Sequence, residues 1–332
     1  MRAQPPTDVE DRVVALAIAD GWRVHVRSLQ YMPVGGGGYH WHLIDTAGRS
    51  LFITVDDLDT KDWLGDDRDT VEKGLIASLD TCRRLRDDAN LGFVVAPILS
   101  DAGRPAMRLG DRYAVSVYQY LFGTSHSFSL QGDPARRDRT LGMLIALHTA
   151  EPPVGVLHHE RPHISGRAHL EAFLRDPDAP WNEGPFGERA RALFAPHADQ
   201  LRGRLDRFDR AAQRAPTSVV VTHGEPHSAN LMTTDDVLML IDWDTVGLAA
   251  PERDLWLVGL DEAGTQRYAE ATGHQPDPDH MALYRERWNL DDLAHVVQRF
   301  RGHHQRDPDN DRWLRGLPAL LHSHSTTRPA TC

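Results

Sequence analysis

The stretch that decides the fold runs from Val219 to Leu255 and reads VVVTHGEPHSANLMTTDDVLMLIDWDTVGLAAPERDL. Residues 219–221 form a β-branched run, and residues 237–241 form a second apolar run. Between them, residues 233–236 read Thr-Thr-Asp-Asp, which are residue types that favour turns. We therefore expect a hairpin-like pair of short strands in this part of the chain.

Polar side chains crowd the ends of these two apolar runs. His223, Glu225 and Asn230 follow the first run, and Asp242 and Asp244 follow the second. Such groups cost free energy when they are buried without a partner. Their concentration at two strand ends indicates a functional site.

The order of these residues resembles that of known enzymes. His223, Gly224 and Glu225 are followed after four residues by Asn230 and then by an apolar run that leads into Asp242. This order resembles the catalytic loop and metal-binding aspartate of kinases, and more specifically the aminoglycoside phosphotransferase family. The strings IDWDTVGLAAPERDLWLVG and YRERWNLDDLAHVV are similar to those of spectinomycin phosphotransferases.

The resemblance implies an α+β fold of the two-lobed protein-kinase-like type. We expect a nucleotide-binding lobe with a small antiparallel sheet at residues 1–120. A mainly helical catalytic and substrate-binding lobe would follow at residues 121–332. A chain of 332 residues is long for one core and suits two lobes.

The hydrophobic pattern supports this division. Thr7-x-x-Glu10 reads as a capping box that starts a helix. Alternating and apolar runs predict strands at residues 23–32, 39–44, 51–55, 93–98, 105–109 and 113–120, and helical spacing predicts helices at about 70–85, from Asp133 onward and at 280–300. The string GHHQRDPDNDRWLRGL shows no periodic core signal, and the extreme C-terminus reads as a loose tail.

Composition limits the compartment and the partners. The formal charge of −11, from 37 basic and 48 acidic residues, argues against a nucleic-acid partner and favours cationic substrates. Only Cys82 and Cys332 are present, so no disulfide framework is indicated. No stretch approaches the roughly 18 apolar residues of a membrane helix, and no secretory signal is visible. We expect a cytoplasmic protein, monomeric or dimeric, that does not bind membranes.

A run of glycines marks a possible nucleotide site. Gly35, Gly36, Gly37 and Gly38 lie between two expected strands, where their N–H groups could approach phosphates, although a flexible hairpin turn explains them as well. The resemblance implies that Gln119, Tyr120 and Leu121 meet adenine. ATP is the nucleotide that the resemblance implies.

The lysine that this family carries on its third strand is missing. Its place falls at Thr54, and a neutral hydroxyl cannot replace the charge. Lys61 and Lys73 could each reach in from elsewhere, and the sequence does not choose between them. Glu72 could be the acid that pairs the strand lysine, or a solvated carboxylate at a helix start.

The resemblance assigns roles to the central stretch. Asn230 and Asp242 match the pair that binds Mg²⁺, and His223 and Glu225 belong to the catalytic loop. Glu225 stands where the family has an aspartate, and its extra methylene moves the carboxylate by about 1.5 Å. The acid is kept, but phosphoryl transfer would be altered or lost if the backbone did not compensate.

The expected late helix offers substrate contacts. Because the family presents acidic groups to the amines of its substrates, Glu286, Asp291 and Asp292 are candidate ammonium partners. Trp288 could provide a cation–π surface. An exposed charged helix face explains the same residues equally well.

Three functions remain open. The first is an ATP-dependent phosphotransferase acting on a hydroxyl of a small cationic molecule, such as an aminocyclitol or aminoglycoside antibiotic, which would confer antibiotic resistance. The second is a pseudokinase-like binding protein, which Thr54 and Glu225 would explain. The third is another nucleotide-dependent reaction that uses Tyr39, His40 and His42.

Overall fold

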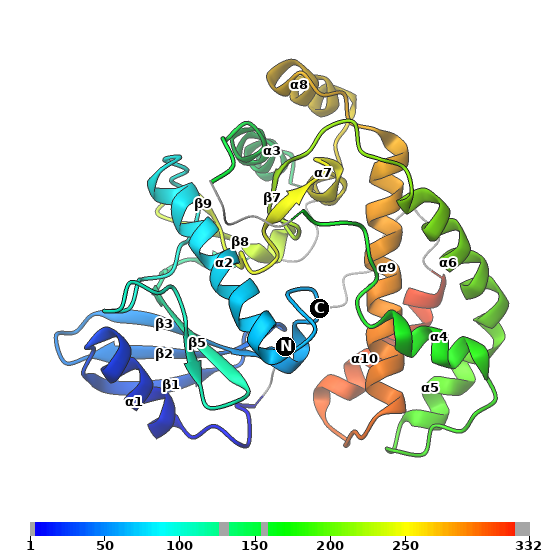
Figure 1. Ribbon diagram of the computed structural model, residues 1–332, viewed down its shortest axis with the longest axis horizontal. Coiled ribbons are helices and arrows are strands. Elements are labelled where there is room, and N and C mark those ends of the chain that lie inside the picture. The colour runs from blue at the N-terminus through cyan, green and yellow to red at the C-terminus, as the bar shows by residue number, and fades with distance from the viewer. Residues whose placement is uncertain (1–3, 126–132, 154–158, 323–332) are drawn as a thin grey trace. The chain divides into compact units, whose positions relative to one another are not determined.

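The computed structural model describes residues 4–125, 133–153 and 159–322. The chain forms two compact units, of which the first comprises Met1–His159 and Val220–Leu248 and the second Glu160–Val219 and Ala249–Cys332. Figure 1 labels their helices and strands. The expected α+β class is confirmed. These units follow packing rather than function, and the lobe boundary between residues 120 and 121 stays a prediction.

The first unit is built on a five-stranded antiparallel sheet in the order β1-β2-β3-β5-β4. The strands are β1 (Val26–Met32), β2 (Gly38–Asp45), β3 (Ser50–Asp57), β4 (Met107–Leu109) and β5 (Tyr113–Gln119). Side chains alternate between the two faces of each strand. Trp41, Ile53 and Val117 share one buried cluster with helix α1 (Asp11–Trp22), which covers that face (Figure 1). The opposite face is therefore left for other contacts.

Two expectations about this unit are wrong. Helix α1 has Glu10 as its N-cap, not Thr7, because Asp8 accepts a hydrogen bond from the Tyr113 hydroxyl and keeps the preceding segment on the sheet. Residues 93–98 form no strand beyond a bridge between Val94 and Leu240.

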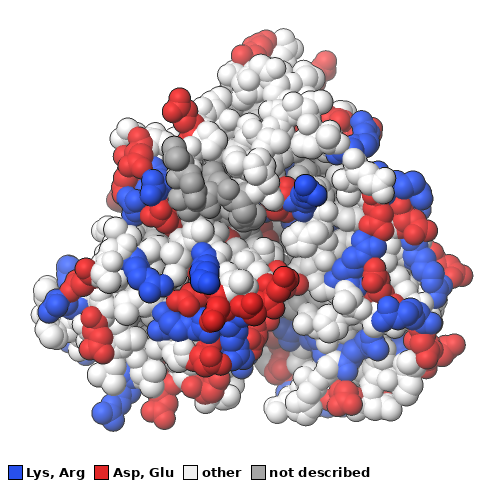
Figure 2. All heavy atoms as spheres, in the orientation of Figure 1, with Lys and Arg blue, Asp and Glu red and all other residues white. Residues whose placement is uncertain are grey.

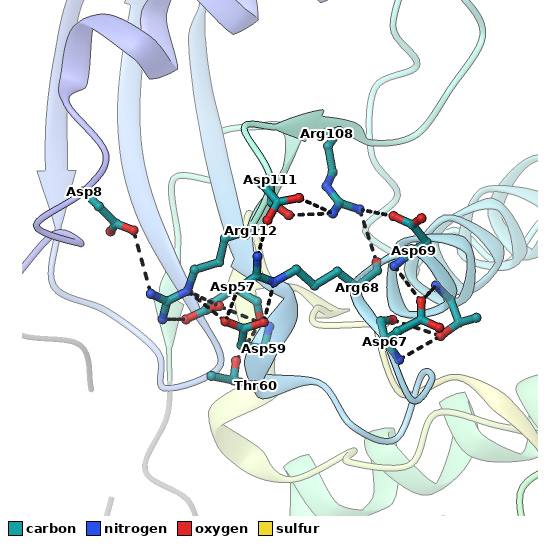
Figure 3. A network of polar contacts seen from close by, with 11 residues as sticks. Asp8, Asp57, Asp59, Thr60, Asp67, Arg68, Asp69, Arg108, Asp111 and Arg112 are labelled. Atoms are coloured by element: carbon teal, nitrogen blue, oxygen red, sulfur yellow. Dashed lines mark hydrogen bonds and ion pairs between the residues drawn. The ribbon is translucent and has the colours of Figure 1, made fainter. Parts of the chain in front are cut away.

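A network of arginines and aspartates fixes the segment after β3 (Figure 3). Arg112 donates two hydrogen bonds to the buried Asp57, at 2.9 and 2.6 Å, and Arg68 donates two to Asp59, at 2.6 and 2.8 Å. Such bidentate pairs fix orientation as well as distance. They hold the short helix η1 (Leu58–Thr60) against the start of α2 (Arg68–Asp87).

The central stretch forms strands, but with different partners from those expected. β7 (Val220–Thr222) pairs with β10 (Gly247–Ala249), whereas β9 (Val237–Leu240) pairs with β8 (Leu231–Thr234). Asp235 and Asp236 make the turn of this hairpin with φ values of 47° and 63°, which aspartate tolerates better than most residues. β6 (Thr124–Ser125) extends the hairpin, and α3 (Pro134–His148) packs near β7. The predicted pairing of the two apolar runs is therefore wrong.

The second unit is helical around one apolar core. Its helices are α4 (Arg167–Arg175), α5 (Gly187–Phe194), η2 (Ala195–His197), α6 (Ala198–Ala212), α7 (Glu252–Val258), α8 (Glu262–Thr272), α9 (Pro278–Arg301) and α10 (Pro308–His322). Leu290, Leu293, Val297 and Phe300 of α9 lie in the core, as the spacing predicted. Helix α10 was not expected, and the expected loose tail beyond it lies outside the described residues.

The surface carries charges of both signs. On the face drawn in Figure 2, Lys and Arg lie interspersed with Asp and Glu rather than gathered in one large field, as far as the described residues show. None of the described helices combines the length and apolar character needed to cross a membrane.

Two glycines test the packing of the second unit. A Cβ at Gly187 would lie 2.1 Å from the Trp181 carbonyl oxygen, so Gly187→Ala should lower the free energy of unfolding by about 1–3 kcal/mol. At Gly203, inside α6, the atom nearest to an added Cβ would be the Arg207 Nη1 at 3.4 Å. Gly203→Ala should therefore raise the free energy of unfolding by about 0.5–1 kcal/mol. Urea unfolding of both variants measures the difference, and equal effects would contradict the packing described.

Candidate active site

The loop after β7 is fixed by His223, which is fully buried. Its Nδ1 accepts a hydrogen bond from the Glu225 N–H at 3.1 Å, and its Nε2 lies 3.0 Å from the Ile241 carbonyl oxygen. Because an amide can only donate and a carbonyl can only accept, the ring proton lies on Nε2. The ring therefore joins the Glu225 loop to the end of β9. This geometry supports a positioning role for His223. Both ring nitrogens are engaged in these two hydrogen bonds, so neither is left to take part in proton transfer.

Asn230 is held within the same loop, in the short helix η3 (Ser228–Asn230). Its Nδ2 donates to the Glu225 carbonyl oxygen at 3.0 Å, and its own carbonyl accepts from the Ile241 N–H at 2.9 Å. Since a carbonyl only accepts, the amide nitrogen must face Glu225. The side-chain oxygen is therefore directed elsewhere and can accept a cation.

Asp242 follows β9 with a φ of 67°, in the left-handed region that few residues other than glycine adopt. The residue retains contact with solvent, but dense protein around its carboxylate raises its pKa well above the ordinary value. Asp244, Glu225 and Asp56 raise the pKa further, and Lys61 opposes them. These carboxylates repel one another, and a divalent cation would relieve the repulsion.

Lys61 is 1% exposed and ends among these carboxylates. Its Nζ lies 2.5 Å from Asp244 Oδ2 and 3.0 Å from Asp56 Oδ1. Burial alone would lower the pKa of Lys61, but Asp244, Asp56 and Asp242 outweigh burial and raise it. The ammonium is therefore charged, as a buried cation with two carboxylate partners should be.

The other basic candidate lies elsewhere. Lys73 is exposed on α2, where it acts on Asp67 at the helix start. Glu72 accepts from Arg108 at 2.9 Å and pairs with Arg104 at 3.4 Å. Glu72 therefore pairs with arginines and Lys73 acts on an exposed aspartate, and neither is among the groups that act on Lys61.

The glycine run passes close to β3. A Cβ at Gly38 would lie 3.1 Å from the Thr54 Cγ2 and 3.3 Å from Asp56 Oδ1, and Gly35 has a φ of 66°. A side chain at Gly38 would require these neighbouring side chains to shift by a few tenths of an ångström. Thr54 itself lies with its Oγ1 3.3 Å from His40 Nδ1. Gly38, the last residue of the run, thus lies beside Asp56, one of the carboxylates that pair with Lys61, and its backbone N–H could meet phosphate there.

An aromatic row continues along the same unit. The Tyr120 ring lies 4.3 Å from the His42 ring and 4.9 Å from the Phe122 ring, and Phe52 stacks on His40 at 5.0 Å. Gln119 ends β5, and Leu121 follows Tyr120. The predicted adenine contacts therefore lie beside flat side chains on which a base could stack.

The substrate residues predicted on α9 belong to the second unit. Glu286 accepts from the buried Arg204 at 2.7 and 3.1 Å, so an ammonium would have to compete with a guanidinium. Asp291 accepts from the Ser165 N–H at 2.8 Å. Trp288 packs edge-on against Trp256 at 5.6 Å, and Asp292 is partly exposed on the same helix. Their predicted substrate roles stay predictions.

Asp56 was missed as a site residue, and the position of Lys61 was left open. In the sequence Asp56 is one of several acids that follow an apolar strand, so it does not stand out. Asp244 is seen only as a neighbour of Asp242. The available signal was the alternation of β3, which puts Asp56 on the face of Thr54. Lys61 gave no such signal, because its reach depends on how the η1 segment folds.

The donor set suits a hard divalent cation. Within residues 4–125, 133–153 and 159–322, no group of three or more His, Cys, Asp or Glu side chains is arranged to hold a metal ion by itself. Mg²⁺ often takes one or two protein oxygens and completes its shell with phosphates and water. The Asn230 Oδ1 and the Asp242 carboxylate fit that mode.

The chain is similar to known proteins along most of its length. A model of the phosphotransferase enzyme family matches residues 78–288. Protein StrN of Streptomyces griseus is 28% identical over 338 aligned residues, which cover 94% of each chain.

Solved structures share the fold. A spectinomycin phosphotransferase in complex with ADP and spectinomycin superimposes with a TM-score of 0.72 at 14% identity, covering 98% of this chain and 97% of that one. An amicoumacin kinase in complex with AMP-PNP and Ca²⁺ gives 0.54 at 13% identity, covering 93% of each chain. The choline kinase LicA from Streptococcus pneumoniae gives 0.51 at 13% identity, covering 95% and 99%. At such identities the likeness concerns the fold.

Proposed function

We propose, since this chain belongs to the phosphotransferase enzyme family, that it transfers the terminal phosphoryl group of ATP to a hydroxyl of a small cationic molecule. The observation that carries the proposal is the meeting of Glu225, Asn230 and Asp242 around the end of β9. Phosphoryl transfer uses a carboxylate near the acceptor hydroxyl and oxygen ligands for a metal ion, and these three residues can supply both.

Each residue has a task in this proposal. Glu225 accepts the proton of the attacking hydroxyl, and His223 holds the Glu225 loop in place. Asn230 and Asp242 hold Mg²⁺, which neutralises phosphate oxygens when it is bound. Gly35 to Gly38 offer N–H groups to the phosphates. Tyr120 and its aromatic neighbours stack on the adenine.

The acceptor class follows from charge and from the relatives. The chain carries a net charge of −11, and Asp291 and Asp292 lie on α9 beside Trp288. Acidic groups beside an indole suit an ammonium ion. One structural neighbour is a spectinomycin phosphotransferase, so an aminocyclitol is the first acceptor to test.

A second candidate is a protein that binds nucleotide or ligand without transfer. The specific observation in its favour is Thr54, whose hydroxyl contacts His40 and carries no charge for a phosphate. Glu225, with its longer arm, fits the same candidate. The two candidates differ only in turnover.

Calorimetric titration with ATP, with and without Mg²⁺, is the experiment that tests the proposal, followed by a transfer assay with spectinomycin and related acceptors. We expect Mg²⁺-dependent binding in the micromolar range and acceptor-dependent release of ADP. Binding without transfer to any cationic acceptor would support the second candidate. Absence of ATP binding would overturn the proposal.

A further inference from the structure

Lys61 lies in the candidate site without a task in the reaction described so far. We propose that Lys61 binds the phosphates of the nucleotide, and so replaces the lysine that Thr54 does not supply. The inference rests on the proposed function and adds to it the residue that determines affinity for the donor.

The first argument is position. Thr54 and Asp56 lie two residues apart on β3, so their side chains share one face of the strand. The Lys61 ammonium lies 3.0 Å from Asp56 Oδ1, and the Cβ position of Gly38 is within 3.3 Å of both Thr54 and Asp56. The charge of Lys61 therefore arrives beside the glycine run, on the strand face where Thr54 stands.

The second argument is rigidity. Lys61 follows η1 directly, and η1 is held by the bidentate contacts of Arg112 with Asp57 and Arg68 with Asp59 (Figure 3). A flexible lysine on a mobile loop would lose entropy on every binding event. Here the loop is already fixed, so the ammonium is placed before any nucleotide arrives.

The third argument is the count of donors and charges. An ammonium has three N–H donors, and Asp56 and Asp244 engage two of them. The nitrogen also lies 5.3 Å from the centre of the Trp63 ring, and a phosphate oxygen would take the place of this weaker contact. Asp244, Asp56 and Asp242 all act electrostatically on Lys61, and Glu225 acts in turn on Asp242. Removing the Lys61 cation would leave a stronger negative field that repels a triphosphate.

The test compares nucleotide affinity in matched variants. Lys61→Met should raise the dissociation constant for ATP with Mg²⁺ about 10- to 100-fold, the loss expected for one charge-assisted hydrogen bond. Lys73→Met, which removes an exposed lysine of the same unit, should leave the constant unchanged. Thr54→Lys added to Lys61→Met should restore affinity, because it returns the charge to the strand. A structural role alone would predict no such rescue.

Folding and function can be separated. If Lys61→Met does not fold, the double variant Lys61→Met with Asp56→Asn also removes a carboxylate that Lys61 would have paired with. The ATP affinity of this double variant is then measured instead. Unchanged ATP affinity in a folded variant lacking Lys61 would overturn the inference, even if the wild-type protein transfers phosphate. Wild-type binding without transfer would overturn the proposed function alone, and lost affinity in the Lys61 variant would still support the inference. Wild-type protein that binds no ATP would overturn both.

Discussion

Asp242→Asn is expected to lower kcat/KM for phosphoryl transfer by at least about 10³-fold, because the change removes an anionic metal ligand worth several kcal/mol. Asparagine is the right replacement. It tolerates the left-handed backbone that Asp242 adopts at a φ of 67°, so the fold should survive. A coupled assay of ADP release measures the loss, and the Mg²⁺ dependence of ATP binding should weaken in parallel.

Asp236→Asn is the matched control. Asp236 has a φ of 63° and lies exposed in the turn between β8 and β9, so the same chemical change is made in a similar backbone conformation. We expect wild-type turnover from this variant. Full activity in Asp242→Asn would place the metal site elsewhere and would contradict the assignment of Asp242.

Glu225→Gln is expected to reduce kcat by about 10²- to 10⁴-fold, the range for loss of a general base. The dissociation constant for ATP should stay the same, because the glutamine keeps the size of the side chain and the loop is held by His223. Rapid-mixing measurement of a single turnover separates the chemical step from binding. The exposed Glu262 provides a control in Glu262→Gln, which should behave as wild type.

The length of the acid can be tested at the same position. Glu225→Asp should preserve or raise turnover if the site works as in relatives that carry an aspartate. A fall to background would instead show that the loop is built around the longer side chain. A fully active Glu225→Gln variant would mean that the carboxylate takes no proton.

Much of the first unit could be predicted from sequence. Alternation and turn residues predicted its antiparallel strands, and in the second unit the apolar spacing of α9 predicted the buried face of that helix, because both signals are local. The pairing of β7 could not be predicted, since its partner β10 is a three-residue Gly-Leu-Ala strand without the apolar run that marks β9. Helix α10 was missed because Gly316 and Pro318 interrupt its pattern, although Leu314, Leu317 and Leu321 pack in the core.

The candidate site shows the same limit. Asn230 and Asp242 were predicted from the resemblance, and the structure brings them together because Asn230 precedes β8 and Asp242 follows β9 of one hairpin. Lys61 could not, because its contact with Asp244 joins residues that are 183 positions apart. Long-range contacts of that kind depend on the completed fold rather than on any local pattern.

The division of the first unit into two chain segments imposes an order on biosynthesis. The segment ending at His159 leaves the ribosome without β7, β8, β9 and β10, which arrive only with Val220–Leu248. Between these two segments the ribosome synthesises Glu160–Val219, which packs with the residues from Ala249 onward. Domains generally fold as units as they emerge. Here each unit must wait for part of the other to be translated, so a nascent chain stalled near residue 159 would expose an unfinished core to chaperones.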